Sequence, residues 1–264
     1  MIEIENLRKR FGTMTVLDGV DLEVPTGNCL VVLGRSGTGK SVLLKHIIGL
    51  IRPDSGSVRV DGIEVTQLPY DGLANLRRRF GMLFQMAALF DSMTVGENVG
   101  LALREHTTKS AAEIAAICEE KLTRVGLPGI QGKKPADLSG GMRKRVGLAR
   151  AIAMDPDYIL YDEPTTGLDP ITAQQINLLI RDLQQGLAIT SVVVTHDMRS
   201  AYAVADRLCL LHEGKIHFVG TPAEIRASAD PVVQQFIQGE AVGPLTETAG
   251  SAGAGRQTRS GRTR

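Results

Sequence analysis

One short stretch of the sequence combines the residue types that bind a chain of phosphates. It runs Gly34-Arg35-Ser36-Gly37-Thr38-Gly39-Lys40-Ser41 and fits the pattern G-x-x-x-x-G-K-[ST]. Glycines lack a Cβ, so the backbone can curl until its N–H groups converge on an anion. Lys40 is predicted to reach the β- and γ-phosphates, and the Ser41 hydroxyl is predicted to bind Mg²⁺. All eight residues are therefore predicted to form a nucleoside triphosphate site.

The sequence on either side of this loop supports the same interpretation. The apolar run Leu30-Val31-Val32-Leu33 before the loop suits a buried strand, and residues 42–49 after it suit a helix. A strand, a glycine loop and a helix in this order direct a helix N-terminus at the phosphates. The alternative is a chance glycine-rich turn, which the flanking elements disfavour.

Two carboxylates follow another predicted buried strand. Asp162 and Glu163 come directly after Tyr158-Ile159-Leu160-Tyr161, at the strand end where α/β sheets bind their ligands. Asp162 is predicted to hold Mg²⁺ through its hydration shell, and Glu163 to prepare a water for attack on the γ-phosphate. Without the glycine loop, an ordinary strand end that turns at Pro164 would be the better interpretation.

Three further residues are predicted to complete the site. Gln85 and His196 each end a strand-like run, so both are interpreted as groups that orient the water or sense the γ-phosphate. Gln85 is also predicted to contact the metal. Phe11 lies in the polar stretch Arg10-Phe11-Gly12 ahead of the loop. It is interpreted as a platform for the base, since such a stack contributes about 1–3 kcal/mol, although a core or turn position is the alternative.

Composition narrows the class of protein. The 264 residues carry a formal net charge of only +1, which argues against a nucleic-acid partner. No apolar run approaches the roughly 18 residues of a membrane span, and no signal peptide is visible. Three scattered cysteines, Cys29, Cys118 and Cys209, predict buried thiols in a reducing compartment such as the cytosol.

The remaining sequence predicts an α/β fold with two additions. Residues 1 to about 28 are predicted to form antiparallel β structure, and residues 92–128 are predicted to be helical, with apolar residues at helical spacing over 111–125. We therefore expect one domain over residues 1–240, with a small helical lobe inserted at about 86–150. Residues 241–264 are expected to be a tail that is disordered or ordered by a partner, with four arginines and no acid after Glu247.

The order of these motifs resembles the ATP-binding cassette (ABC) ATPases. The resemblance covers residues 1 to about 240 and implies a P-loop NTPase core, an antiparallel β subdomain and a helical lobe, with ATP and Mg²⁺ as cofactors. Leu138-Ser139-Gly140-Gly141-Met142 matches the family signature, with methionine in place of the commoner glutamine. Ser139, Gly140 and Gly141 are thereby implied to bind the γ-phosphate held by Lys40 of a second copy. Asp169 matches a loop that lies along the seam of this head-to-tail homodimer.

A narrower resemblance concerns the Mla/Mce branch of the family. It is carried by residues 81–95, 103–107, 230–236 and 239–244 together with Met142. The branch implies an ATPase that powers phospholipid or other lipid transport at the cytoplasmic face of the bacterial inner membrane. Its implied partners are a membrane permease and a substrate-binding protein with an Mce domain, with room for a small regulatory subunit.

Two alternatives remain open from the sequence. The same ATPase could serve a permease for an amino acid, a metal or a drug, or it could be a soluble ABC ATPase of cofactor assembly. Roles on DNA or the ribosome fit less well, because the chain has neither a long coiled-coil insertion nor a second cassette.

Overall fold

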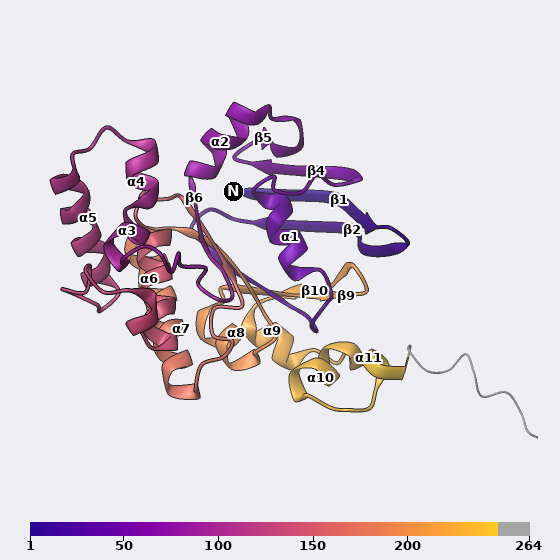
Figure 1. Ribbon diagram of the computed structural model, residues 1–264. Helices are drawn as coiled ribbons and strands as arrows, with labels where there is room; N and C mark the ends of the chain where they lie inside the picture. The colour runs from indigo at the N-terminus through magenta and orange to yellow at the C-terminus, as the bar shows by residue number, and fades with distance from the viewer. Residues whose placement is uncertain (248–264) are drawn as a thin grey trace, which may run out of the picture.

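The computed structural model describes residues 1–247, and its centre is a six-stranded sheet (Figure 1). The strand order is β10-β9-β3-β8-β7-β6. All neighbours are parallel except β9 and β10, which form an antiparallel hairpin. The bounds are β3 Cys29–Leu33, β6 Phe80–Leu83, β7 Tyr158–Asp162, β8 Thr190–Thr195, β9 Arg207–His212 and β10 Lys215–Gly220. The predicted α/β class is therefore confirmed.

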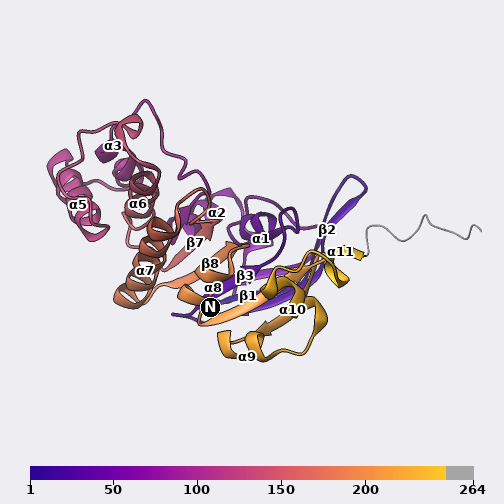
Figure 2. The same cartoon turned by 90° about the horizontal axis from the view of Figure 1, so that it is seen from below.

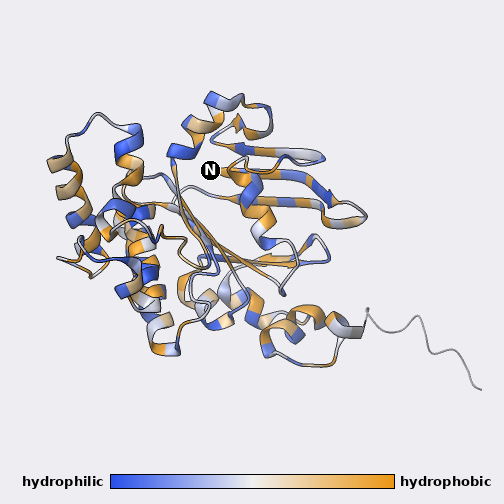
Figure 3. Ribbon diagram, viewed as in Figure 1, coloured by the Kyte–Doolittle hydropathy of each residue, from blue (hydrophilic) through white to orange (hydrophobic). Residues whose placement is uncertain are grey.

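The central strands are apolar throughout because both faces of the sheet are covered. Alternate residues of β3 enter different cores: Val31 and Leu33 face the helices, whereas Leu30 and Val32 face the second sheet. All five residues of β3 are buried. Figure 3 shows hydrophobic colours on these strands and an alternation of hydrophobic and hydrophilic residues along the helices. The predicted burial of the three cysteines is confirmed, and their thiols are free.

A smaller antiparallel sheet covers one face, together with helix α1 (Lys40–Ile47). Its order is β2-β1-β4-β5, with bounds β1 Ile2–Phe11, β2 Met14–Val24, β4 Ser55–Val60 and β5 Ile63–Glu64. Asp61 and Gly62 connect β4 to β5 with φ values of +49° and +77°. Both values belong to the tight hairpin turn that the Asp-Gly pair predicts. A 3₁₀ turn, Val65–Gln67, and helix α2 (Tyr70–Arg78) then lead to β6.

The helical lobe lies on the other side of the large sheet from the antiparallel sheet (Figures 1 and 2). The stretch expected to be helical over 92–128 divides into α3 (Val95–Val99), α4 (Leu101–His106) and α5 (Ala111–Arg124). Helix α6 (Gly140–Ala151) follows a 3₁₀ turn, Pro135–Asp137, and α7 (Pro170–Leu187) follows β7. The Ser139 hydroxyl accepts a hydrogen bond from the Met142 N–H at 3.2 Å and so caps the start of α6.

The C-terminal part continues past residue 240. Helices α8 (Met198–Val204), α9 (Pro222–Ala227) and α10 (Pro231–Gln238) are followed by a single turn, α11 (Pro244–Glu247). Leu245 is buried, and its N–H donates to Gln235 Oε1 at 2.6 Å, so the first residues of the predicted tail pack on their own chain. Residues 248–264, with the four arginines, lie outside the described residues. Among residues 1–247, no helix is both long and apolar enough to cross a membrane.

The contact between β6 and α6 gives a test of the fold. A Cβ added to Gly81 would lie 2.2 Å from the Ala151 carbonyl oxygen, so Gly81→Ala must push α6 away from the sheet. We expect a loss of about 1–3 kcal/mol in the free energy of unfolding, measured by urea denaturation. Gly132→Ala is the control, because nothing lies within 4 Å of its added Cβ. Equal stability of the two variants would contradict the described packing.

Candidate nucleotide-binding site

The glycine loop lies between β3 and α1, as the sequence predicts. Gly39 is the N-cap of α1 and has φ +101°, a conformation that favours glycine. A Cβ there would also lie 2.8 Å from Val16 Cγ1 on β2, and a Cβ on Gly34 would lie 2.7 Å from the Leu211 carbonyl oxygen. The loop is thus pressed against neighbouring backbone and side chains, and glycine is needed at both positions.

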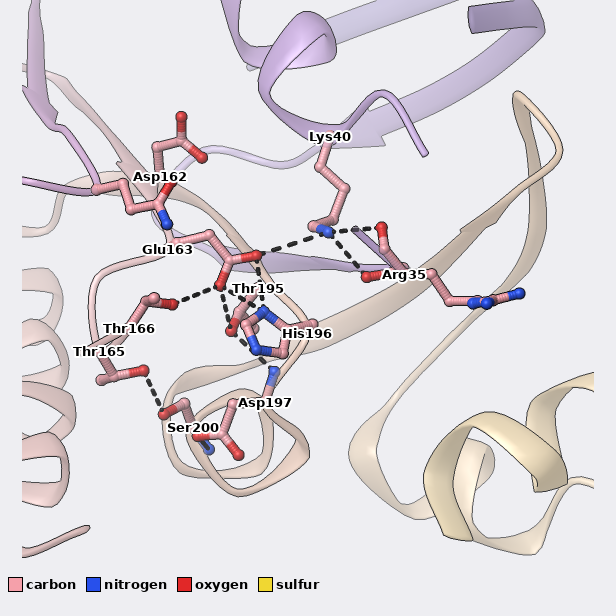
Figure 4. Close-up of polar contacts among 12 residues, drawn as sticks. Arg35, Lys40, Asp162, Glu163, Thr165, Thr166, Thr195, His196, Asp197 and Ser200 are labelled. Atoms are coloured by element: carbon pink, nitrogen blue, oxygen red, sulfur yellow. Dashed lines mark hydrogen bonds and ion pairs between the residues drawn. The ribbon is translucent and has the colours of Figure 1, made fainter. Parts of the chain in front are cut away.

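The Lys40 side chain folds back into the curl of this loop (Figure 4). Its Nζ donates to the carbonyl oxygens of Gly34 at 2.8 Å and Arg35 at 3.0 Å, and it lies 3.6 Å from Glu163 Oε1. Burial lowers the pKa of Lys40, and the Glu163 carboxylate opposes that shift. The ammonium group therefore occupies the centre of the loop. A bound phosphate chain would replace the carbonyl oxygens and the carboxylate as the partners of this group.

Ser41 and Asp162 meet beside Lys40. The Ser41 hydroxyl, in the first turn of α1, donates to Asp162 Oδ1, at the end of β7, over 2.8 Å. Both are hard oxygen ligands of the kind Mg²⁺ uses when it keeps several waters and shares a phosphate oxygen. The pair therefore fits a magnesium ion delivered with a nucleotide.

Glu163 is held by several bonds in an unusual conformation. Its φ is +48°, in the left-handed region that costs a non-glycine residue roughly 1–2 kcal/mol. Its N–H donates to the Val194 carbonyl oxygen at 3.0 Å. Its carboxylate accepts from the Thr166 hydroxyl at 3.1 Å and contacts His196 Nδ1 at 3.0 Å (Figure 4). These bonds fix the direction of the carboxylate, which points toward Lys40.

A cavity of about 340 Å³ joins most of the predicted site residues. Gln85, Glu163 and His196 line it together with the loop residues Ser36, Gly37, Gly39, Lys40 and Ser41. Phe11, Met14 and Val16 also line it and contribute apolar side chains. The cavity thus combines polar groups suited to phosphates with apolar side chains suited to a base.

Two predicted loop residues point elsewhere. Arg35 Nη1 donates to the Leu245 carbonyl oxygen at 2.7 Å, which ties the loop to α11. The Thr38 hydroxyl donates to the Arg35 carbonyl oxygen at 2.9 Å and so stays within the loop. Neither side chain lines the cavity, so any nucleotide contact from these two residues falls to their backbone groups.

The residues of the signature and Asp169 lie outside the cavity of their own chain. Asp169 caps α7, because its carboxylate accepts from the N–H groups of Ile171 and Thr172, each at 3.0 Å. A Cβ on Gly141 would lie 2.5 Å from Thr172 Cγ2, so the signature helix and the start of α7 are in close contact. One chain therefore brings together only part of the predicted set.

Lys144 on α6 adjoins the site although the sequence does not single it out. It is 4% exposed, and its Nζ donates to the carbonyl oxygens of Gln85 at 2.5 Å and Glu163 at 3.2 Å. Burial lowers its pKa to about 8. Because Arg143 and Arg145 flank it, the sequence favours the interpretation that Lys144 belongs to a solvent-exposed basic run. Its helical spacing from Gly141 and Gly147, which are also buried, is the signal that places it on the inner face.

Comparison with known proteins gives one family and close relatives. The family model described as ABC transporter matches residues 17–166. The "Probable ribonucleotide transport ATP-binding protein mkl" of Mycobacterium leprae is 43% identical over 244 residues, which cover 92% of this chain and 70% of that protein. The "Intermembrane phospholipid transport system ATP-binding protein MlaF" of Haemophilus influenzae is 40% identical over 245 residues, 93% of each chain.

A solved structure shares most of this fold. The dimeric post-hydrolysis state of the ATP-binding cassette MJ0796, bound to ADP and Pi, has a TM-score of 0.77 and 34% sequence identity. The match covers 84% of this chain and 98% of that one.

The fit of Gly39 against Val16 gives a test of the site. Gly39→Ala combines a clash with a disfavoured φ, so the loop must open and its N–H groups must diverge. We expect the affinity for a fluorescent ATP analogue to fall more than about tenfold, which corresponds to about 1.4 kcal/mol. Gly27→Ala is the matched control: its φ is +78°, but nothing lies within 4 Å of its Cβ. Unchanged affinity in Gly39→Ala would contradict the described loop.

Proposed function

Because the chain belongs to the ABC transporter family and is the ATPase subunit of a transporter, we propose that it powers phospholipid movement through a membrane permease. The observation that carries this proposal is the 40% identity to a phospholipid transport ATP-binding protein along 93% of both chains. A ribonucleotide substrate is the second candidate, because the name of the mycobacterial relative mentions it at 43% identity.

The geometry suggests how the chain holds ATP. Phe11 stacks on the base, and the N–H groups of the glycine loop surround the phosphates. Lys40 exchanges the carbonyl oxygens of Gly34 and Arg35 for β- and γ-phosphate oxygens. Ser41, Asp162 and Gln85 are the residues that would hold Mg²⁺, which when bound neutralises phosphate charge.

Glu163 then prepares the attacking water. When Lys40 turns to the phosphates, the Glu163 carboxylate loses its cationic neighbour and is free to accept a proton from a water in line with the γ-phosphate. His196 keeps the carboxylate oriented through the contact at 3.0 Å, and its ring lines the same cavity. The reaction cleaves the bond between the β- and γ-phosphates and releases ADP and phosphate.

We further propose that two copies close head-to-tail around two ATP molecules. Ser139, Gly140, Gly141 and Asp169 lie outside the cavity of their own chain, which fits a role on the nucleotide of a second copy. The similarity to a dimeric cassette supports the same arrangement. The assembly would lie at the cytoplasmic face of the bacterial inner membrane, held there by the permease. A substrate-binding protein with an Mce domain and a small regulatory subunit are the further partners proposed.

The role of Glu163 is tested by Glu163→Gln. The amide retains the shape but cannot take a proton, so we expect ATP to bind and to hold two copies together while hydrolysis slows by roughly 10²–10⁴-fold. Phosphate release and light scattering with ATP measure the two effects. Lys40→Ala is expected to lose ATP binding instead. Hydrolysis at the wild-type rate in Glu163→Gln would show that another group is the base.

The substrate is tested by transport in vesicles. Co-expression with neighbouring permease genes is expected to yield a complex that moves labelled phospholipid between vesicles when ATP is present. Glu163→Gln in the same complex is the control and is expected to abolish the transfer. ATP-dependent uptake of ribonucleotides without phospholipid transfer would establish the second candidate instead.

A further inference from the structure

Lys144 is a buried cation without an ion-pair partner within residues 1–247. Lys121, the other buried lysine outside the glycine loop, pairs with Asp155 at 2.7 Å and Glu120 at 3.0 Å. Lys144 instead donates to two carbonyl oxygens, those of Gln85 and Glu163. The carboxylates of Glu163 and Asp162 are near enough to favour its charge without touching it. Since burying an ammonium group costs several kcal/mol, its location calls for an explanation.

The two carbonyl groups belong to segments that the sheet itself does not join. Strands β6 and β7 are paired from Phe80 with Tyr158 to Leu83 with Tyr161, and the ladder ends there. Gln85 and Glu163 lie just beyond that end, where no hydrogen bond of the β6–β7 ladder joins the two segments. The ammonium group of Lys144, on helix α6, joins the two segments by donating to both carbonyl oxygens.

The bridge also bears on the strained conformation of Glu163. Its N–H is fixed by the Val194 carbonyl oxygen on β8, and its C=O is fixed by Lys144. The left-handed φ of +48° needs such support, because the surroundings must overcome its cost. Without the donor on the carbonyl group, the turn can relax and carry the carboxylate away from Lys40 and His196.

We propose that Lys144 is a positioning residue for ATP hydrolysis. Its ammonium group holds Glu163 in the conformation that directs the carboxylate at the attacking water, and it ties this turn to the segment of Gln85. A displacement at Gln85 therefore reaches Glu163 through one side chain. This inference rests on the role of Glu163 proposed above.

The first experiment compares Lys144→Met with Lys121→Met in the full-length protein. Each variant removes one buried ammonium group and leaves an unbranched side chain that is one atom shorter. We expect kcat of Lys144→Met to fall on the order of 10–100-fold, the effect of a misplaced catalytic group. KM and the affinity for a fluorescent ATP analogue are expected to stay within about twofold, since the hydrogen bonds of Lys144 do not reach the glycine loop that surrounds the phosphates. Lys121→Met is expected to lower Tm and leave kcat unchanged.

A double-mutant cycle with Glu163→Gln shows whether Lys144 acts through Glu163. Lys144→Met is expected to slow the wild-type protein but to have no further effect on the residual hydrolysis of Glu163→Gln. An equal fall in both backgrounds would overturn the inference, and so would an unchanged kcat in Lys144→Met. A normal rate in Glu163→Gln itself would instead remove the proposed role of Glu163, so the two failures can be told apart.

A second pair of variants covers a failure of Lys144→Met to fold. Lys144→Arg keeps the charge and the donors, whereas Lys144→Gln keeps only a shorter amide donor. We expect Lys144→Arg to retain the higher kcat of the two. The reverse order, or equal rates, would overturn the inference.

Discussion

Buried charge is the constraint on which this site depends. Lys40, Lys144 and Glu163 are each less than 10% exposed, and Asp162 lies among them at the end of β7. An isolated ion in a protein interior is penalised by several kcal/mol, so these groups are tolerated only because each has partners. Lys40 and Lys144 each donate to two carbonyl oxygens, and the Glu163 carboxylate contacts Thr166 and His196. The strands and helices around them serve to keep those partners in reach.

The same balance explains how the site prepares for its ligand. The partners of Lys40 are a loop carbonyl pair and a carboxylate at 3.6 Å, which are weaker than the oxygens of a triphosphate. A triphosphate would therefore be a better partner for the Lys40 ammonium group than the groups that it contacts in this structure. The partners of Lys144 are backbone carbonyl groups, so its hydrogen bonds leave the side chains of Gln85 and Glu163 free to face the cavity.

Local patterns predict much of this structure, and tertiary contacts decide the rest. Short apolar runs and turn residues are enough to predict the glycine loop and the buried strands. The same kind of local signal marks the bounds of α9 and α10. The helical lobe is divided into several short helices. The start of α5 is also encoded locally, because Ser110 and Glu113 form a capping box that can be recognised in the sequence. The left-handed conformation of Glu163 is supported by the hydrogen bond from its N–H to the Val194 carbonyl oxygen on β8. Leu245 is held in place by the hydrogen bond from its N–H to Gln235 Oε1. No local pattern encodes those two contacts.

The position of strand β3 links nucleotide binding to the folding of the whole chain. Its residues alternate between the two cores, and the glycine loop follows directly from its last residue. The loop can therefore take shape only when both cores have formed, which makes nucleotide a ligand of the fully folded chain alone. At a concentration one hundred times its Kd, such a ligand adds about 2.7 kcal/mol to the free energy of unfolding. Saturating ATP is therefore expected to slow proteolysis of this protein by stabilising its folded state.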